Sequence, residues 1–249
     1  MTNWPQGYGL HVVSEVDSTL NEAARIADTA SGPVWIMAHK QTAARGRRGR
    51  AWTHPQGNLA ATLLMRPHDP PEISALRSFV AALALFDACV AVTGRSTGLA
   101  LKWPNDVLLN GGKLAGILLE STGHGSALSH LAIGIGVNLA QAPAAHMVEP
   151  GAVRPVSLLS ETGANVTPDD FLVELAAAYA RFEDQFVTFG FAPVRTAWLA
   201  RAARLGEVVT ARTVTSETVG TFETVDAGGN LVLNTAKGRV NIPAAEVFF

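Results

Sequence analysis

The sequence predicts a domain of mixed helices and strands over residues 1–205, followed by a small β-rich domain over residues 206–249. In the first region helical periodicity alternates with short β-branched runs, whereas the second contains only short β-rich runs between Gly-containing turns. The 249 residues are 48% hydrophobic and 16% charged, which is a globular composition. These proportions exclude disordered and fibrous classes of protein.

Four segments of the first domain carry helix signals. Thr19 and Glu22 have the spacing of a capping box, so a helix is expected to start there. Thr167 as N-cap and Pro168 at the first helical position start another helix, whose apolar side chains recur every three or four residues. The first helix is expected to begin at Asp17–Thr19. The other three are expected over residues 73–92, 168–189 and 194–205.

Strand signals occur in both regions. Asn110-Gly111 is a strong hairpin signal, so the runs on either side of it are expected to pair. Strands are expected over residues 34–38, 58–65, 107–109, 114–119 and 131–139, and, in the second domain, over residues 208–212, 218–225, 231–234 and 240–242. The second set predicts a small β-barrel appended to the first domain.

Charge and cysteine content exclude further classes. A net charge of −2 leaves no global basic field of the kind that binds nucleic acid. The single cysteine, Cys89, cannot form an intrachain disulfide and fits a reducing compartment. No signal-peptide pattern opens the chain, and the most apolar stretch, residues 79–92, is interrupted by Asp87. A cytoplasmic protein with no membrane partner is therefore expected.

The segment from Gln41 to Trp52 is the first with chemical content. Four of the fifteen arginines fall within residues 45–50. Guanidinium groups suit phosphate and carboxylate, and the intervening glycines let the backbone approach a ligand closely. Trp52 adds a flat apolar face that can stack on a base. The segment predicts an anion-binding loop, with a nucleic-acid contact and a solvated basic loop as the alternatives.

Two of the four lysines, Lys102 and Lys113, lie at either end of the segment that contains the predicted hairpin. Pairing of its strands can point both ammonium groups into one cleft, where they would stabilise charge on phosphate oxygens. Asp106, between them, has the oxygen ligands that Mg²⁺ prefers. The alternative is an edge hairpin with two exposed lysines and an Asx turn at Asn105 and Asp106.

Glycines alternate with apolar residues from Ile133 to Asn138. This pattern usually marks a place where a ligand or a packed neighbour approaches the backbone of a strand. A lone Gly-x-Gly is a weak nucleotide signal, and no helix follows it within a turn. Taken alone, the segment favours close packing against the strand.

Together these segments resemble the biotin–protein ligases. Asp17-Ser18-Thr19, the arginine run with Trp52, Lys-Trp-Pro-Asn-Asp at 102–106, Lys-Leu-Ala-Gly-Ile-Leu-Leu-Glu at 113–120 and Gly-Ile-Gly-Val-Asn at 134–138 occur in that family's order. The likeness covers residues 14–140, and the β-rich C-terminal region is similar to the family's small SH3-like domain.

The resemblance implies an α+β fold: a mixed, largely antiparallel sheet backed by helices, like that of class II aminoacyl-tRNA synthetases, plus a C-terminal SH3-like β-barrel. It implies two reactions. Biotin and ATP, with Mg²⁺, give biotinyl-5′-AMP and pyrophosphate. A lysine of a biotin carboxyl carrier protein or domain then takes the biotin and releases AMP.

The resemblance also implies three sets of site residues. The biotin-binding set is Ser18, Thr19, Gln41, Arg45, Gly46, Arg47, Lys113, Gly116 and Leu118. The ATP-binding set is Arg47, Arg48, Trp52, Asn105 and Asn138. The catalytic set is Lys113, Arg45, Lys102 and Asp106, with Asp106 also on Mg²⁺. The arginines would close over the adenylate, because an acyl adenylate exposed to water hydrolyses.

The sequence departs from the family pattern at two positions. Ala44 stands where glycine is usual before the arginine run, and Leu20 stands where asparagine is common, with Asn21 one place later. Neither change removes a charge or a nucleophile, so altered kinetics rather than lost chemistry are expected.

Sixteen residues precede Asp17, which is too few for the DNA-binding domain that some members carry. We expect a monofunctional ligase with no DNA partner, and the resemblance leaves a homodimer open. A lipoate or octanoate transferase with the same catalytic fold is one alternative function. A nucleic-acid-binding module based on the arginine run is another, and it would show steeply salt-dependent binding.

Overall fold

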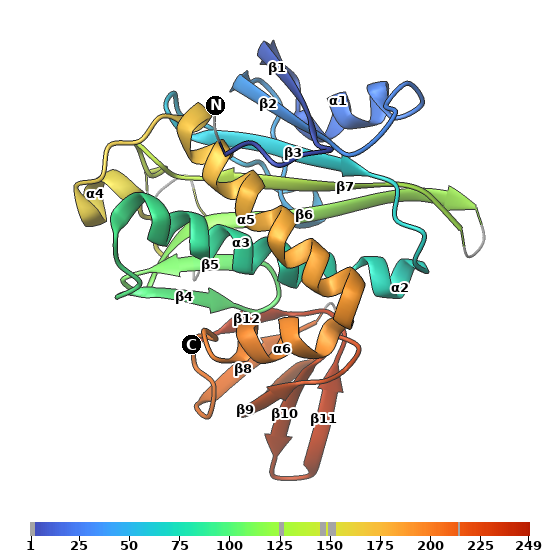
Figure 1. Ribbon diagram of the computed structural model, residues 1–249. Coiled ribbons are helices and arrows are strands. Elements are labelled where there is room, and N and C mark those ends of the chain that lie inside the picture. Colours follow the sequence, from blue (N-terminus) through green and yellow to red (C-terminus); the bar gives the residue numbers. More distant parts are fainter. Residues whose placement is uncertain (1–2, 125–126, 145–147, 149–152, 214) are drawn as a thin grey trace.

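The computed structural model describes residues 3–124, 127–144, 148, 153–213 and 215–249 (Figure 1). A seven-stranded sheet has the order β1-β2-β3-β7-β6-β5-β4, and a second, five-stranded sheet has the order β11-β10-β9-β8-β12. Only β1 and β2 pair in parallel in the first sheet. The predicted mixed, largely antiparallel α+β fold is therefore confirmed.

The strands of the first sheet are β1 (Gly9–Val16), β2 (Val34–Gln41), β3 (Leu59–Met65), β4 (Leu99–Lys102), β5 (Asp106–Leu109), β6 (Gly112–His124) and β7 (Ala127–Val137). Those of the second are β8 (Val208–Arg212), β9 (Glu217–Val225), β10 (Leu231–Thr235), β11 (Gly238–Ile242) and β12 (Glu246–Phe248). The helices are α1 (Thr19–Ile26), the short η1 (Arg47–Gly49), α2 (Pro71–Ser74), α3 (Arg77–Thr93), α4 (Leu158–Thr162), α5 (Pro168–Phe189) and α6 (Phe191–Leu199).

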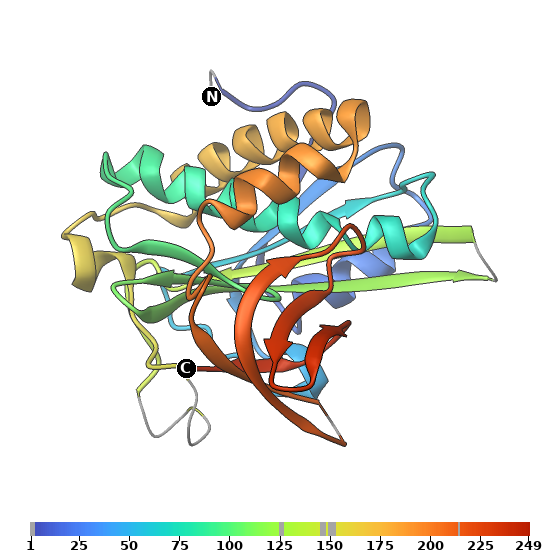
Figure 2. The same cartoon turned by 90° about the horizontal axis from the view of Figure 1, so that it is seen from below.

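The first sheet lies between two helical layers. Figure 2 shows α3, α5 and α6 on one side of it and α1 on the other. The alternation of side chains along β2 matches this arrangement: Trp35 and Met37 enter the large core under α3 and α5, and Ile36 faces the smaller core under α1. Burial on both faces explains why β2 and β3 are apolar at consecutive positions.

The predicted hairpin is confirmed. Asn110 and Gly111 both have positive φ, 49° and 77°, which is the left-handed conformation that a two-residue turn between paired strands requires. This turn joins β5 to β6 and sets the register Leu109↔Gly112 and Leu108↔Lys113. The hairpin therefore determines where Lys113 enters the sheet.

Three sequence predictions need correction. Ser18, not Thr19, is the N-cap of α1: its side chain accepts a hydrogen bond from Leu20 N, and Thr19 is the first helical residue. The helix expected over residues 73–92 is two helices, because α2 ends before α3 begins at Arg77. The last helix of the first domain ends at Leu199 rather than 205, and the residues after it form turns.

Several elements had no clear signal in the sequence. β1 is an edge strand with most side chains exposed or half-buried, β4 and β12 are four and three residues long, and α4 has five residues. Such short or exposed elements carry too few apolar side chains for a periodic pattern. Their formation depends on the neighbours against which they pair.

The second sheet packs against the end of the first domain. In Figure 1 its strands lie below β4 and β5, at the level of α6 and beneath it. Trp103 in the turn after β4 donates its indole Nε1–H to Gly229 O at 3.0 Å, in the turn between β9 and β10. The predicted small β-rich C-terminal domain is confirmed as five antiparallel strands, and its SH3-like barrel character stays a prediction.

Among the described residues, the stretch Pro71–Thr93 is the one helical segment long and apolar enough to cross a membrane, and 67% of its most apolar 18 residues are buried here. It packs against α5 and against the first sheet. Its apolar composition is therefore that of a core helix.

The interface between α3 and α5 contains a buried ion pair. Arg77, 2% exposed, lies 2.8 Å from Glu183 through Nη2, and also donates from Nε to Glu183 Oε1 at 2.9 Å. Tyr179 donates its hydroxyl to Glu183 Oε2 at 3.2 Å. These contacts compensate the cost of burying both charges between the helices.

We predict that Arg77→Met lowers the free energy of unfolding by about 3–5 kcal/mol, because Glu183 keeps a buried charge without its partner. Urea unfolding measures this change. The matched control is Arg239→Met, which breaks an exposed pair with Glu223 and should cost no more than about 1 kcal/mol. Equal losses in the two variants would contradict the assignment of Arg77 as the compensating charge.

Candidate active site

One large cavity, of about 1190 Å³, opens where β6 and β7, the start of α1, the arginine-rich loop and the second sheet meet. A pocket for one drug-sized ligand is typically about 300–1,000 Å³. The volume therefore allows two small molecules to bind side by side.

Every residue that the sequence analysis assigned to a site lines this cavity. They come from α1, β2, the arginine-rich loop, the β4–β5 turn, β6 and the end of β7: Ser18, Thr19, Gln41, Arg45, Gly46, Arg47, Arg48, Trp52, Lys102, Asn105, Asp106, Lys113, Gly116, Leu118 and Asn138. The expectation that Lys102 and Lys113 face one cleft is confirmed. The alternative of an edge hairpin with two exposed lysines is wrong, because Lys102 is 9% exposed.

One end of the cavity is neutral and polar. Gln41 Oε1, at the end of β2, accepts hydrogen bonds from Thr19 N at 2.9 Å and from Thr19 Oγ1 at 3.2 Å. Thr62 donates its hydroxyl to Thr19 Oγ1 at 2.8 Å from β3. Ser18 and Thr19 are 2% and 4% exposed. These groups present oriented donors and acceptors to a neutral polar ligand.

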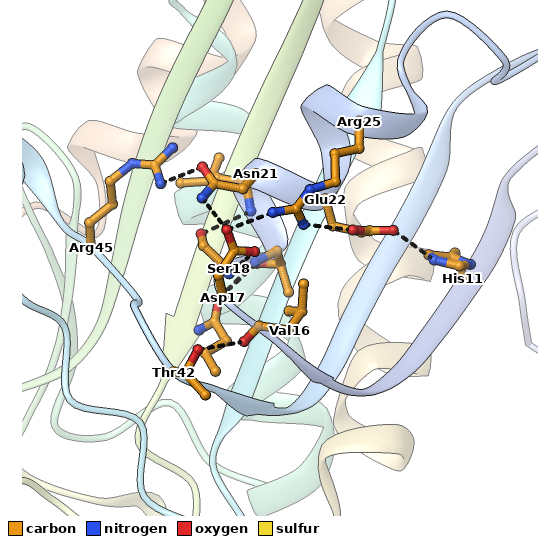
Figure 3. Close-up of polar contacts among 12 residues, drawn as sticks. His11, Val16, Asp17, Ser18, Asn21, Glu22, Arg25, Thr42 and Arg45 are labelled. Carbon is orange, nitrogen blue, oxygen red and sulfur yellow. Dashed lines mark hydrogen bonds and ion pairs between the residues drawn. The ribbon is translucent and has the colours of Figure 1, made fainter.

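Arg45 anchors the base of the arginine-rich loop. It contacts Glu120 on β6 with two parallel bonds, Nε–Oε1 at 3.0 Å and Nη2–Oε2 at 2.7 Å, and donates from Nη1 to Asn21 Oδ1 at 2.7 Å. Asn21 in turn donates to Asp17 at 2.7 Å, and Arg25 pairs with the same carboxylate (Figure 3). The hydrogen bond from Arg25 holds the pKa of Asp17 well below its usual range. The network connects the loop to α1.

The other end of the cavity is cationic. Lys113 Nζ lies 2.7 Å from Asp106 Oδ1, so the lysine on β6 and the carboxylate at the start of β5 form an ion pair. Lys102 is buried beside them, and burial lowers its pKa, which the charge of Asp106 partly opposes. Burial and then the neighbouring Arg48 lower the pKa of Arg47. Three cations thus gather around one carboxylate, which suits an anionic ligand.

Asn105 and Asn138 hold the backbone of this end in place. Asn105 Nδ2 donates to Ile117 O at 2.5 Å, and Ile117 N donates back to Asn105 O at 2.9 Å. Asn138, 1% exposed, donates from its backbone N to Leu114 O at 2.9 Å and from Nδ2 to Lys113 O at 3.5 Å. Both asparagines therefore bind the backbone of β6, the strand that carries Lys113.

The alternating glycines make room for an indole. Gly116 on β6 pairs with Gly136 on β7, and Trp52 lies over both. A Cβ on Gly136 would lie 2.6 Å from Trp52 Nε1, closer than real contacts allow. Gly134 in the same way receives Leu20, 3.0 Å from the position of a Cβ. The close approach expected from the glycine pattern is therefore confirmed, and its partners are Trp52 and Leu20.

The sequence analysis missed the contribution of the second domain. Glu246, Phe248 and Phe249 also line the cavity, and Glu246 pairs with Arg50 and with Arg48, the latter at 3.5 Å. No motif marks Glu246, which lies 196 residues from Arg50 along the chain. Leu20 and Glu120 also take part in the site, and the sequence motifs that contain them do not indicate their partners Gly134 and Arg45.

The described residues of this site offer few ligands for a divalent cation. Among the residues that the structure describes, no group of three or more His, Cys, Asp or Glu side chains can hold a metal ion. Asp106 is the carboxylate nearest the lysines, and it is already paired with Lys113. Mg²⁺ usually takes one or two protein carboxylates and completes its shell with water and phosphate oxygens, and a single carboxylate such as Asp106 is compatible with that mode.

Comparison with known proteins agrees with this geometry. Residues 11–138 match the Biotin/lipoate A/B protein ligase family, and residues 205–249 match the Biotin protein ligase C terminal domain. A Biotin--[acetyl-CoA-carboxylase] ligase from Paracoccus denitrificans is 56% identical over 238 residues, which are 96% of this chain and 99% of that protein. A Bifunctional ligase/repressor BirA from Bacillus subtilis is 29% identical over 95% of this chain and 71% of its own length.

Solved structures agree as well. The biotin protein ligase from Aquifex aeolicus, determined in complex with biotin and ATP, has a TM-score of 0.80 at 25% identity, covering 96% of this chain and 97% of that chain. The matched regions include both domains and every predicted site residue. The chain therefore belongs to the biotin protein ligase family.

Proposed function

We propose that this protein is an ATP-dependent biotin–protein ligase. It forms biotinyl-5′-AMP and pyrophosphate from biotin and ATP, and then transfers biotin to a lysine of a biotin carboxyl carrier protein or domain. The observation that carries this proposal is the single cavity that joins a neutral polar end, at Ser18, Thr19 and Gln41, to a cationic end around Lys113. Such a cavity places a neutral ring and a carboxylate next to phosphates.

The neutral end suits the ureido ring of biotin. That ring carries both donors and acceptors, which must be matched once they leave water. Ser18, Thr19 and Gln41 supply such groups, and the bonds from Thr19 hold the carboxamide of Gln41 in one orientation. Gly116 and Leu118 line the cavity on β6, the strand that carries Lys113, and we place the valeryl chain along them.

In the first step a carboxylate oxygen of biotin attacks the α-phosphorus of ATP, and the bond from that phosphorus to the bridging oxygen of pyrophosphate breaks. Negative charge grows on the phosphate oxygens as this happens. Lys113, Lys102 and Arg47 surround the place where we put these oxygens. Fixed cations in a water-poor site stabilise that charge more than water does.

In the second step the uncharged ε-amine of a carrier lysine attacks the acyl carbon of biotinyl-5′-AMP. The bond from that carbon to the phosphate oxygen breaks, AMP leaves, and the nitrogen loses a proton. We assign to Asp106 the orientation of the incoming amine or the acceptance of its proton, and we also propose it as a contact for Mg²⁺ bound to ATP, because its carboxylate lies beside Lys113 in the cavity. Trp52 supplies an apolar surface for adenine above Gly116 and Gly136.

The two alternative functions make different demands. The matched family includes lipoate ligases as well as biotin ligases. A competition experiment between biotin and lipoate shows which acid the protein uses. A nucleic-acid module needs free cations, but Arg45 is paired with Glu120, and Arg48 and Arg50 with Glu246.

We further propose a cytoplasmic enzyme without a DNA partner, and self-association through an exposed sheet edge stays a prediction.

The test of the function is pyrophosphate release with magnesium–ATP in the presence of biotin, lipoate or no acid, with mass spectrometry of the small molecule retained by the protein. Release that requires biotin, with biotinyl-5′-AMP bound, is expected. Release with lipoate alone would favour the transferase, and no release with either acid from folded protein would contradict the proposal.

Replacing Lys113 by Gln is expected to lower biotin-dependent pyrophosphate release by about 10²–10³-fold, because the charge nearest the reacting carboxylate and phosphate is lost. Lys237→Gln, at an exposed lysine of the second domain, is the matched control and should keep wild-type rates. A Lys113→Gln enzyme within threefold of wild type would remove Lys113 from the mechanism.

Gly136→Ala is expected to displace Trp52, since the new methyl group cannot share the space of the indole. The KM for ATP should rise by about 5–150-fold, as expected when stacking worth about 1–3 kcal/mol is lost. Tryptophan fluorescence should shift in the ligand-free protein. Gly32→Ala, where the nearest atom is 4.0 Å away, serves as control, and unchanged ATP affinity in Gly136→Ala would rule out this role for Trp52.

A further inference from the structure

We propose that Glu246, in the second domain, is a positioning residue that holds the arginine-rich loop over the cavity. The inference rests on the proposed function, because it assigns Arg47, Arg48 and Arg50 to the nucleotide side of the site. It makes the C-terminal domain part of the catalytic centre.

The loop is held at two separate points. At its base, Arg45 is bound by Glu120 and Asn21 of the first domain. At its far end, within the part of the chain that the structure describes, Arg48 and Arg50 pair with the two carboxylate oxygens of Glu246 in the second domain. The backbone next to Glu246 contributes as well, since Arg47 Nη1 donates to Ala245 O at 3.3 Å.

The segment between these two points needs a restraint. Gly46 and Gly49 give its backbone freedom, and Arg48 is held in the left-handed conformation with φ 58°. A residue other than glycine adopts that conformation only where surrounding contacts compensate the cost. Among the described residues the acidic side chain paired with this segment is Glu246.

The positive charge of the loop also requires a nearby carboxylate, which Glu246 supplies. Arg47, Arg48 and Arg50 repel one another, and Arg48 contributes to the lowered pKa of Arg47 after burial itself. The carboxylate of Glu246 offsets this repulsion, and its own pKa is lowered chiefly by the hydrogen bond from Arg50. β12 brings it there by pairing with β8, in the register Glu246↔Arg212.

Glu246 acts on the nucleotide end and not on the neutral end. Its partners lie on the loop side of the cavity, whereas Ser18, Thr19 and Gln41 have their hydrogen-bond partners on α1, β2 and β3. Loss of the carboxylate should therefore weaken ATP binding and leave biotin binding intact. A general loss of structure would affect both substrates.

The experiment compares Glu246→Gln with wild type in two measurements. Trypsin cleavage after Arg47, Arg48 and Arg50 is followed by mass spectrometry without ligand, and the KM values for ATP and biotin are measured separately. We expect cleavage in the loop to be at least about fivefold faster, because protection depends on how often the loop opens. The KM for ATP should rise about tenfold, as for one lost charge-assisted hydrogen bond, with the biotin KM unchanged.

Two further variants complete the design. Glu223→Gln removes a carboxylate of the same domain that pairs with Arg239 outside the cavity, and it should match wild type in both measurements. Glu246→Asp keeps the charge on a shorter side chain and should recover at least half of the protection from trypsin.

The outcomes separate the inference from the proposed function. Loop cleavage and ATP KM that are unchanged in Glu246→Gln would overturn the inference. Faster cleavage at all sites alike, with a lower Tm, would also overturn it, because Glu246 would then only stabilise the domain. If wild-type protein releases no pyrophosphate with biotin, the proposed function fails, while the ligand-free proteolysis still decides the role of Glu246.

Discussion

The pairing of β6 with β7 is the constraint on which the rest of the site depends. Its register places Gly116 beside Gly136, and this pair of residues without side chains leaves the space that Trp52 fills. Lys113 lies at the start of β6, and Asn138 follows the end of β7. A shift of one residue would turn these groups to the opposite face of the sheet, so the register carries the chemistry.

The polar contacts around the cavity divide its tasks between the two domains. The first domain supplies the start of α1, the lysines on β4 and β6, and two asparagines, one in the β4–β5 turn and one directly after β7. The second domain contributes through a few side chains at its edge, among them Glu246. Trp103, which donates a hydrogen bond to the second domain, directly follows Lys102 in the chain. The same segment therefore contributes to the interface between the domains and to the active site.

The departures from the family pattern find a physical explanation in the tertiary contacts. Leu20, at the position where asparagine is common, is buried against Gly134. The glycine leaves room for this apolar side chain because it has no Cβ. Asn21, one position later, connects Arg45 with Asp17 (Figure 3). Ala44 lies on the cavity wall and accepts a backbone hydrogen bond from Trp52 N at 3.0 Å.

Local sequence determined the long helices, the Asn110-Gly111 hairpin and the set of chemical groups, because caps, turn residues and motifs act over a few neighbouring positions. Hairpin pairing predicted one cleft for Lys102 and Lys113, whereas the grouping of the other site residues in one cavity followed from resemblance. Tertiary structure alone decided the edge strand β1 and the pairing of Glu246 with Arg48 and Arg50. Those features depend on groups far apart along the chain, and no local pattern encodes which distant charge will meet which.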